Sequence, residues 1–173
     1  RSRQATVIDR VVDALRQIEG AYSVVCLTKN MVVGVRDPLG VRPLVLGQIG
    51  EAYILASETC ALDIVGADFV RDIEPGEMVV LDDSGVHSIR PFAEQNRRFC
   101  VFEYIYFSRP DSVVEGLSVY EARKSIGREL AKENQAPADV VIPVPDSGVP
   151  AAIGYAEAAG VPFELGIIRN HYV

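Results

Sequence analysis

The sequence has 173 residues, of which 49% are hydrophobic and 24% charged, and this globular composition excludes disordered, collagenous and fibrous proteins. A net charge of −7 without a basic stripe argues against a nucleic-acid-binding surface. The apolar runs are too short to span a membrane, and no secretory signal precedes the first helix pattern. The three cysteines, Cys26, Cys60 and Cys100, are widely spaced, which is typical of a reducing compartment. We therefore expect a cytoplasmic protein.

The first half of the chain predicts one helix followed by antiparallel strands. Apolar residues recur at three- and four-residue spacing from Val7 to Ile18, and Gly20 is a plausible stop. Short β-rich runs then alternate with turn-forming residues at hairpin spacing. The expected strands are residues 22–28, 31–35, 44–47, 53–56, 70–73, 78–81 and 86–89, with a short helix at 58–65.

After Pro91 the pattern changes from hairpins to alternating strands and helices. A polar stretch at 94–98 indicates a domain edge near residues 88–96, and we divide the chain into domains at 1–90 and 91–173. Residues 99–107 predict an extended aromatic segment. Ser118 and Glu121 have capping-box spacing at the start of a helix over 118–134. A strand at 140–144, a helix at 151–159 and a strand at 163–168 predict a parallel, right-handed βαβ unit.

The turn Pro145-Asp146-Ser147-Gly148 is the first candidate site, because it follows a buried strand and opens a helix. Ser147 can cap the first helical turn, and Gly148 lets the backbone approach a ligand closely. Amide groups at a helix N-terminus suit phosphate or pyrophosphate. A plain capping turn without a ligand has the same spacing, so the local pattern leaves both interpretations open.

The second candidate is the loop 36–44, which reads RDPLGVRPL. Asp37 can cap its own turn and pair with Arg36 or Arg42. Two arginines in one loop can also grip a carboxylate bidentately. A structural, ion-paired hairpin is the alternative.

Five segments carry a resemblance to a known family: IEGAYSVVCL, RDPLGVRPLVLG, LASETCALDIVGADFVRDIEPGEMVVL, FEYIYFSRPDS and VVIPVPDSGVPAAIGYAEAAGVPF. In this order they resemble glutamine phosphoribosylpyrophosphate amidotransferases, over essentially the whole chain. The resemblance implies an α+β region followed by an α/β region. Residues 1–90 are then the back half of an αββα glutaminase sandwich of the N-terminal-nucleophile type. Residues 91–173 begin the parallel sheet of a type I phosphoribosyltransferase.

The resemblance also implies an activity. Members of this family release ammonia from glutamine and couple it to phosphoribosyl pyrophosphate, giving 5-phosphoribosylamine, pyrophosphate and glutamate in the first committed step of purine synthesis. Their catalytic N-terminal cysteine has no counterpart in Arg1, and their acidic phosphoribosyl pyrophosphate loop does not occur before Val173. We therefore expect no catalytic residue in this chain and no complete activity from it alone. The alternative function is a non-catalytic binding or scaffold module that uses the same elements.

By the same resemblance, Asp146, Ser147 and Gly148 bind the pyrophosphate side of the substrate, and Ser147 helps to hold magnesium. Cys100 corresponds to one of four ligands of a 4Fe–4S cluster in the iron–sulfur subclass. The loop with Asp37 and Arg42 has a structural role beneath the glutamine site. We also expect a homo-oligomer and no nucleic-acid or membrane partner.

Overall fold

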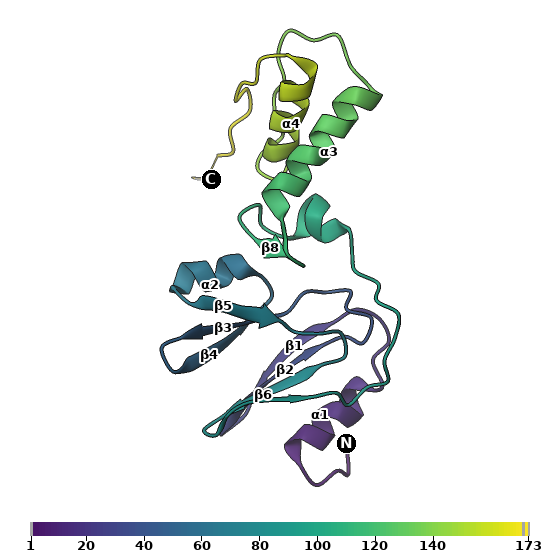
Figure 1. Ribbon diagram of the computed structural model, residues 1–173, viewed down its shortest axis with the longest axis vertical. Coiled ribbons are helices and arrows are strands. Elements are labelled where there is room, and N and C mark those ends of the chain that lie inside the picture. The colour runs from purple at the N-terminus through teal and green to yellow at the C-terminus, as the bar shows by residue number, and fades with distance from the viewer. Residues whose placement is uncertain (1, 171, 173) are drawn as a thin grey trace. The chain divides into compact units, whose positions relative to one another are not determined.

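The computed structural model describes residues 2–170 and 172, and it divides into two compact units, residues 1–100 and 101–173 (Figure 1). The division follows Cys100 rather than residue 90, because the intervening segment is hydrogen-bonded to the first unit. The amide of Arg98 donates to the Leu39 carbonyl at 2.7 Å, and the amide of Cys100 donates to the Val41 carbonyl at 3.3 Å. The assignment of domains to residues 1–90 and 91–173 stays a prediction.

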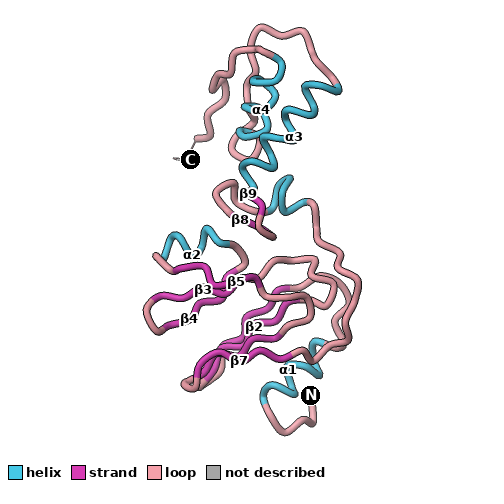
Figure 2. The backbone as a smooth tube through the Cα atoms, viewed as in Figure 1, coloured by secondary structure: helices cyan, strands magenta, loops and turns pink. Residues whose placement is uncertain are grey.

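The first unit contains two antiparallel sheets and two helices (Figure 2), and its antiparallel pairing is the one that the hairpin spacing predicts. The strands of one sheet follow the order β1-β2-β6-β7, and those of the other follow β4-β3-β5. The elements are α1 (Val7–Leu15), β1 (Ser23–Leu27), β2 (Met31–Arg36), β3 (Val45–Ile49), β4 (Ala52–Ala56), α2 (Thr59–Val65), β5 (Asp68–Asp72), β6 (Met78–Asp82) and β7 (Gly85–Ile89). Helix α1 is capped by Thr6, whose hydroxyl accepts a hydrogen bond from the Asp9 amide at 3.0 Å.

The two sheets stack face to face because successive residues of each strand point to opposite sides. On β6, Met78 and Val80 pack in the core under α1, whereas Val79 packs in the core between the sheets. On β3, Leu46 joins the core between the sheets and Val45 packs against Leu62 of α2. The layers of the first unit are therefore helix, sheet, sheet, helix, with α1 and α2 on opposite outer faces (Figure 1). This arrangement agrees with the sandwich that the resemblance implies.

The second unit is mainly helical. Its elements are a π-helical turn η1 (Glu103–Phe107), the two-residue strands β8 (Val113–Val114) and β9 (Leu117–Ser118), and the helices α3 (Val119–Glu133) and α4 (Val149–Ala159). The expected cap of α3 is confirmed, since the Ser118 hydroxyl accepts a hydrogen bond from the Glu121 amide at 3.4 Å.

The prediction of an extended segment at 99–107 is wrong for its second half, which forms η1. The Ser108 amide donates to the Glu103 carbonyl, and the buried guanidinium of Arg123 donates to the carbonyls of Tyr104 and Ser108, both at 2.7 Å. A side chain from α3 thus satisfies carbonyl groups that a strand would pair with a neighbouring strand.

The expected strands at 140–144 and 163–168 are reduced to a single parallel bridge between Val141 and Phe163 in the described part of the chain. The Val141 amide donates to the Pro162 carbonyl at 2.8 Å, and the Glu164 amide donates to the Val141 carbonyl at 3.0 Å. A longer ladder is disfavoured because Pro143 and Pro145 have no N–H group to donate.

Helices α3 and α4 pack through two glycines. A Cβ atom on Gly127 would collide with the carbonyl oxygen of Ala151, and one on Gly154 would collide with the carbonyl oxygen of Lys124. Each obstacle is backbone of the opposite helix, so it cannot move without moving that helix. The absence of two side chains therefore sets the separation of the helices.

Replacing either Gly127 or Gly154 with alanine is expected to destabilise the second unit by about 1–3 kcal/mol. At an exposed helix position, replacing glycine with alanine normally stabilises a protein by about 1 kcal/mol. Here the close backbone contact should make the same replacement destabilising. Urea unfolding followed by circular dichroism measures the change, with the exposed substitution Glu133→Ala on α3 as a control. Equal or greater stability of both glycine variants would contradict the packing argument.

Candidate functional site

The turn before α4 is the part of the chain best arranged to receive an anion. Helix α4 begins at Val149 with Gly148 as its N-cap, and no side chain caps it, so the expected capping role of Ser147 is wrong. Gly148 is instead needed because its Cβ would lie 2.7 Å from the Val144 carbonyl oxygen. The turn folds on itself through hydrogen bonds from Gly148 N to Val144 O at 3.2 Å and from Val149 N to Asp146 O at 3.3 Å.

The turn also presents backbone donors that the described residues leave unused. Within the described part of the chain, the amides of Asp146 and Ser147 donate no hydrogen bond. They lie at the N-terminal end of an 11-residue helix, where the helix dipole favours negative charge. Such a group of amides can bind a phosphate oxygen without any rearrangement of side chains.

The side chains around this turn are mixed in charge. The Asp146 carboxylate is 3.6 Å from the guanidinium of Arg169, and both side chains are exposed. Ser147 is half-buried and borders a small hollow of about 160 Å³, which Ile105, Arg123, Ile126, Gly148 and Ala151 also line. Sequence reasoning did not single out Arg123 or Arg169, because an isolated arginine is normally a solvent-exposed residue.

The oxygen atoms of this turn fit the ligand chemistry of magnesium. Mg²⁺ is usually bound by one or two carboxylates and by substrate phosphates, and it keeps several water molecules. Asp146 offers one carboxylate and Ser147 one hydroxyl. Among the described residues, no three His, Cys, Asp or Glu side chains form a group that can hold a metal. The turn can therefore supply part of the coordination of Mg²⁺, while the phosphate groups of a bound substrate would supply further oxygen ligands.

The cysteines of this chain do not by themselves fit a 4Fe–4S cluster, which requires four ligands. The chain has three cysteines, all with free thiols: Cys60 is buried, and Cys26 and Cys100 are half-buried. Cys100 is the last residue of the first unit. Cys100 can supply one of the four cluster ligands, and other residues would have to supply the remaining ones.

The loop after β2 is held by its own polar groups. The Asp37 carboxylate accepts hydrogen bonds from the amides of Leu39, Val41 and Arg42, at 3.0 to 3.2 Å. The Arg36 side chain is fully buried and donates to the carbonyls of Arg42, Ile73 and Gly40, at 2.8, 2.8 and 3.1 Å. These bonds confirm the capping by Asp37 and support the structural interpretation of the loop.

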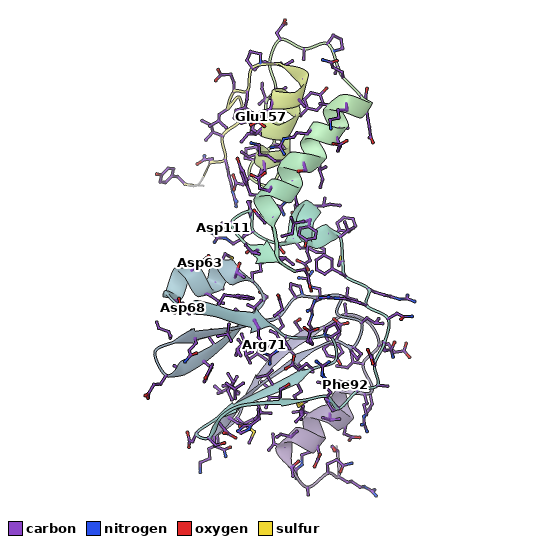
Figure 3. All side chains as sticks on the ribbon, in the orientation of Figure 1. Asp63, Asp68, Arg71, Phe92, Asp111 and Glu157 are labelled. Atoms are coloured by element: carbon purple, nitrogen blue, oxygen red, sulfur yellow. The ribbon has the colours of Figure 1, made fainter. Side chains whose placement is uncertain are left out.

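A second buried charge lies beside this loop. Glu77 is within the first unit's core, and its carboxylate accepts hydrogen bonds from both Nη atoms of Arg71, from Ser88 Oγ and from the Glu74 amide. Arg71 is labelled in Figure 3. Burial raises the pKa of Glu77, but the hydrogen bonds from Arg71, Ser88 and Glu74 together lower this pKa by more. The net result is a pKa below the usual value for glutamate.

The chain shows extensive similarity to known proteins. A glutamine amidotransferase domain model matches residues 4–63. The amidophosphoribosyltransferase of Rhizobium etli is 54% identical over all of this chain, and that of Bacillus subtilis is 50% identical over all of it. Over its whole length the chain is similar to a segment of these amidophosphoribosyltransferases. It spans 36% of the length of each of these two relatives.

Solved structures show the same similarity. The glutamine phosphoribosylpyrophosphate amidotransferase of B. subtilis, solved in complex with ADP and GMP, superposes with a TM-score of 0.94 at 49% identity. It matches 99% of this chain with 38% of its own. A structure described as the allosteric regulatory enzyme of purine biosynthesis also gives a TM-score of 0.94, at 50% identity over the whole chain. In the part of the chain that the structure describes, no helix is both long and apolar enough to cross a membrane.

Because its pKa is lowered in the folded state, the Glu77 carboxylate is expected to stabilise the first unit above its unfolded pKa of about 4.3. This contribution should disappear as the pH falls through the lower pKa of the folded state, where the carboxylate becomes protonated. Glu77→Gln should reduce the free energy of unfolding by about 1–3 kcal/mol at neutral pH and flatten its decline in acid. Urea unfolding at several pH values measures both effects, with the exposed Glu51→Gln as control. A Glu77→Gln variant with the full acid dependence would contradict the assignment.

Proposed function

We propose that this chain contributes parts of two domains to an amidophosphoribosyltransferase that converts glutamine and phosphoribosyl pyrophosphate into 5-phosphoribosylamine, pyrophosphate and glutamate. The observation that carries the proposal is the similarity over the whole chain to enzymes of this name, at 50–54% identity in two of them. Residues 1–90 then belong to the C-terminal part of the glutaminase domain. Residues 91–173 begin the type I phosphoribosyltransferase domain and its parallel sheet.

The turn at 146–148 is the pyrophosphate subsite of this proposal. Ammonia attacks the anomeric carbon of the ribose, and the bond from that carbon to the pyrophosphate oxygen breaks, so negative charge accumulates on the leaving pyrophosphate. The amides of Asp146 and Ser147 donate to that group, and the dipole of α4 adds to the attraction. Bound magnesium would supply further positive charge there, held by the Ser147 hydroxyl and by carboxylates outside this chain.

Cys100 is proposed as one thiolate ligand of a 4Fe–4S cluster in the complete enzyme. Its place at the end of the first unit suits a ligand that ties distant parts of a chain together. The remaining proposals are a cytoplasmic location and a homo-oligomeric enzyme. The alternative, a scaffold module, would be encoded by a reading frame that lacks the nucleophilic cysteine and the acidic phosphoribosyl-binding motif.

Ser147→Ala in the full-length enzyme is expected to raise the KM for phosphoribosyl pyrophosphate by about tenfold, the equivalent of one lost charge-assisted interaction. It should also raise the magnesium concentration needed for half-maximal activity. Ser125→Ala, an exposed serine on α3, is the control. In calorimetry, the 173-residue chain should bind Mg²⁺ weakly or not at all. Tight Mg²⁺ binding by this chain, or an unchanged KM in Ser147→Ala, would contradict the proposed role.

Anaerobically purified full-length enzyme is expected to be brown, with iron and acid-labile sulfide bound, because a 4Fe–4S cluster absorbs visible light. Cys100→Ser should lower the iron content, since one of four ligands is replaced by a harder one. Cys26→Ala is the matched control, because this half-buried cysteine belongs to the core under α1. A colourless, iron-free and fully active wild-type preparation would refute the cluster.

A further inference from the structure

A pocket in the first unit is assembled from three separate segments and borders the loop 36–44 through Pro38. Its volume is about 400 Å³, within the range of small-molecule sites. The end of α1 supplies Leu15, Arg16 and Ile18; the body of the unit supplies Tyr22 and Pro38; and the segment before the second unit supplies Pro91, Phe92, Ala93 and Gln95. Phe92 packs against the core beneath α1 and is labelled in Figure 3.

Tyr22 is the unusual member of this lining. Its side chain belongs to the core under α1, and the residue is only 9% exposed. The phenol oxygen makes no hydrogen bond to any residue that the structure describes. Burial, and secondarily the negative charge of Asp37, raises the pKa of this phenol, so it is a neutral O–H donor at physiological pH. Among the described residues, the hydroxyl oxygen is not one of the buried polar atoms that lack a partner, so it is open to solvent and free to donate to a ligand in the pocket.

Arg16 supplies a cation at the rim of the same pocket. Its Nη2 atom donates to the Pro91 carbonyl at 3.1 Å, which holds the guanidinium across the gap between α1 and the segment at 91–95. The O–H donor of Tyr22 and the guanidinium of Arg16, together with the leucine, isoleucine, proline and phenylalanine side chains of the lining, match one negatively charged acceptor group on an apolar body. Inorganic phosphate has no apolar surface that could pack against these side chains.

We propose that this pocket binds a small organic carboxylate with an apolar body, the carboxylate accepting hydrogen bonds from the Tyr22 hydroxyl and the Arg16 guanidinium. The apolar body fills the space between Ile18, Pro38 and Phe92. The inference is independent of the proposed pyrophosphate subsite, because the pocket lies wholly within residues 15–95.

Isothermal titration calorimetry of the 173-residue chain with phenylacetate tests the pocket, and phenylacetamide and inorganic phosphate serve as comparison probes. Phenylacetate should bind with a millimolar Kd or tighter, and the neutral amide and phosphate should bind at least about fivefold more weakly. Tyr22→Phe removes one oxygen atom and should weaken phenylacetate binding about fivefold. Arg16→Gln, at an exposed position, should weaken it about tenfold and remains informative if Tyr22→Phe fails to fold.

Tyr53→Phe is the matched control, because Tyr53 lies on β4 and does not line this pocket. Binding that survives unchanged in both Tyr22→Phe and Arg16→Gln would overturn the proposal. So would a wild-type chain that binds no phenylacetate in the millimolar range, which would leave water as the partner of the Tyr22 hydroxyl. Equal binding of phenylacetate and phenylacetamide would refute the role given to the carboxylate.

Discussion

The buried guanidinium of Arg36 is the constraint on which the first unit depends. The loop after β2 connects the two sheets, since β2 belongs to one and β3 to the other, and the segment between β5 and β6 connects them again. Arg36 donates to the Gly40 and Arg42 carbonyls of this loop and also to the Ile73 carbonyl, just after β5. One side chain therefore joins the last residue of a strand in the first sheet to the end of a strand in the second. A lysine could not replace it, because a single ammonium lacks the planar fork that reaches three separate carbonyls.

Asp37 completes this arrangement, because its carboxylate accepts from backbone amides, which the guanidinium of Arg36 cannot do as it is a donor only. Its carboxylate accepts from three backbone amides of the loop, while its own amide donates to the Tyr22 carbonyl of the segment that precedes β1. The two charges thus lie in the core with their hydrogen-bonding capacity directed at backbone groups. Buried charges are tolerated when they are bonded in this way. The Arg36 guanidinium, which already donates to three backbone carbonyls, has little capacity left to bind a substrate carboxylate.

The elements predicted best from sequence are those whose signals are local. The hairpins of the first unit follow from turn residues and short β-rich runs, and Ser118 marks the start of α3 because capping involves neighbours only three residues apart. The errors depend on distant partners. Nothing between residues 99 and 107 reveals that Arg123 binds the carbonyls of Tyr104 and Ser108, so a periodicity argument favours a strand there. Likewise, Tyr22 reads as an ordinary strand residue, and only the structure shows that it lines a pocket together with residues 91–95.

The position of the candidate anion site depends on the contact between the two helices of the second unit. The amides of Asp146 and Ser147 precede α4 directly, so their place is fixed by wherever the first turn of that helix lies. That turn contains Ala151, whose carbonyl oxygen occupies the space where a side chain on Gly127 would be. A glycine in the middle of α3 consequently determines how far the amides stand from the side chains of α3 and η1 that line the hollow beside Ser147. The sequence of the turn identifies the Asp146 and Ser147 amides as donors for a phosphate. Their position, however, is fixed by the packing of Gly127 against the first turn of α4.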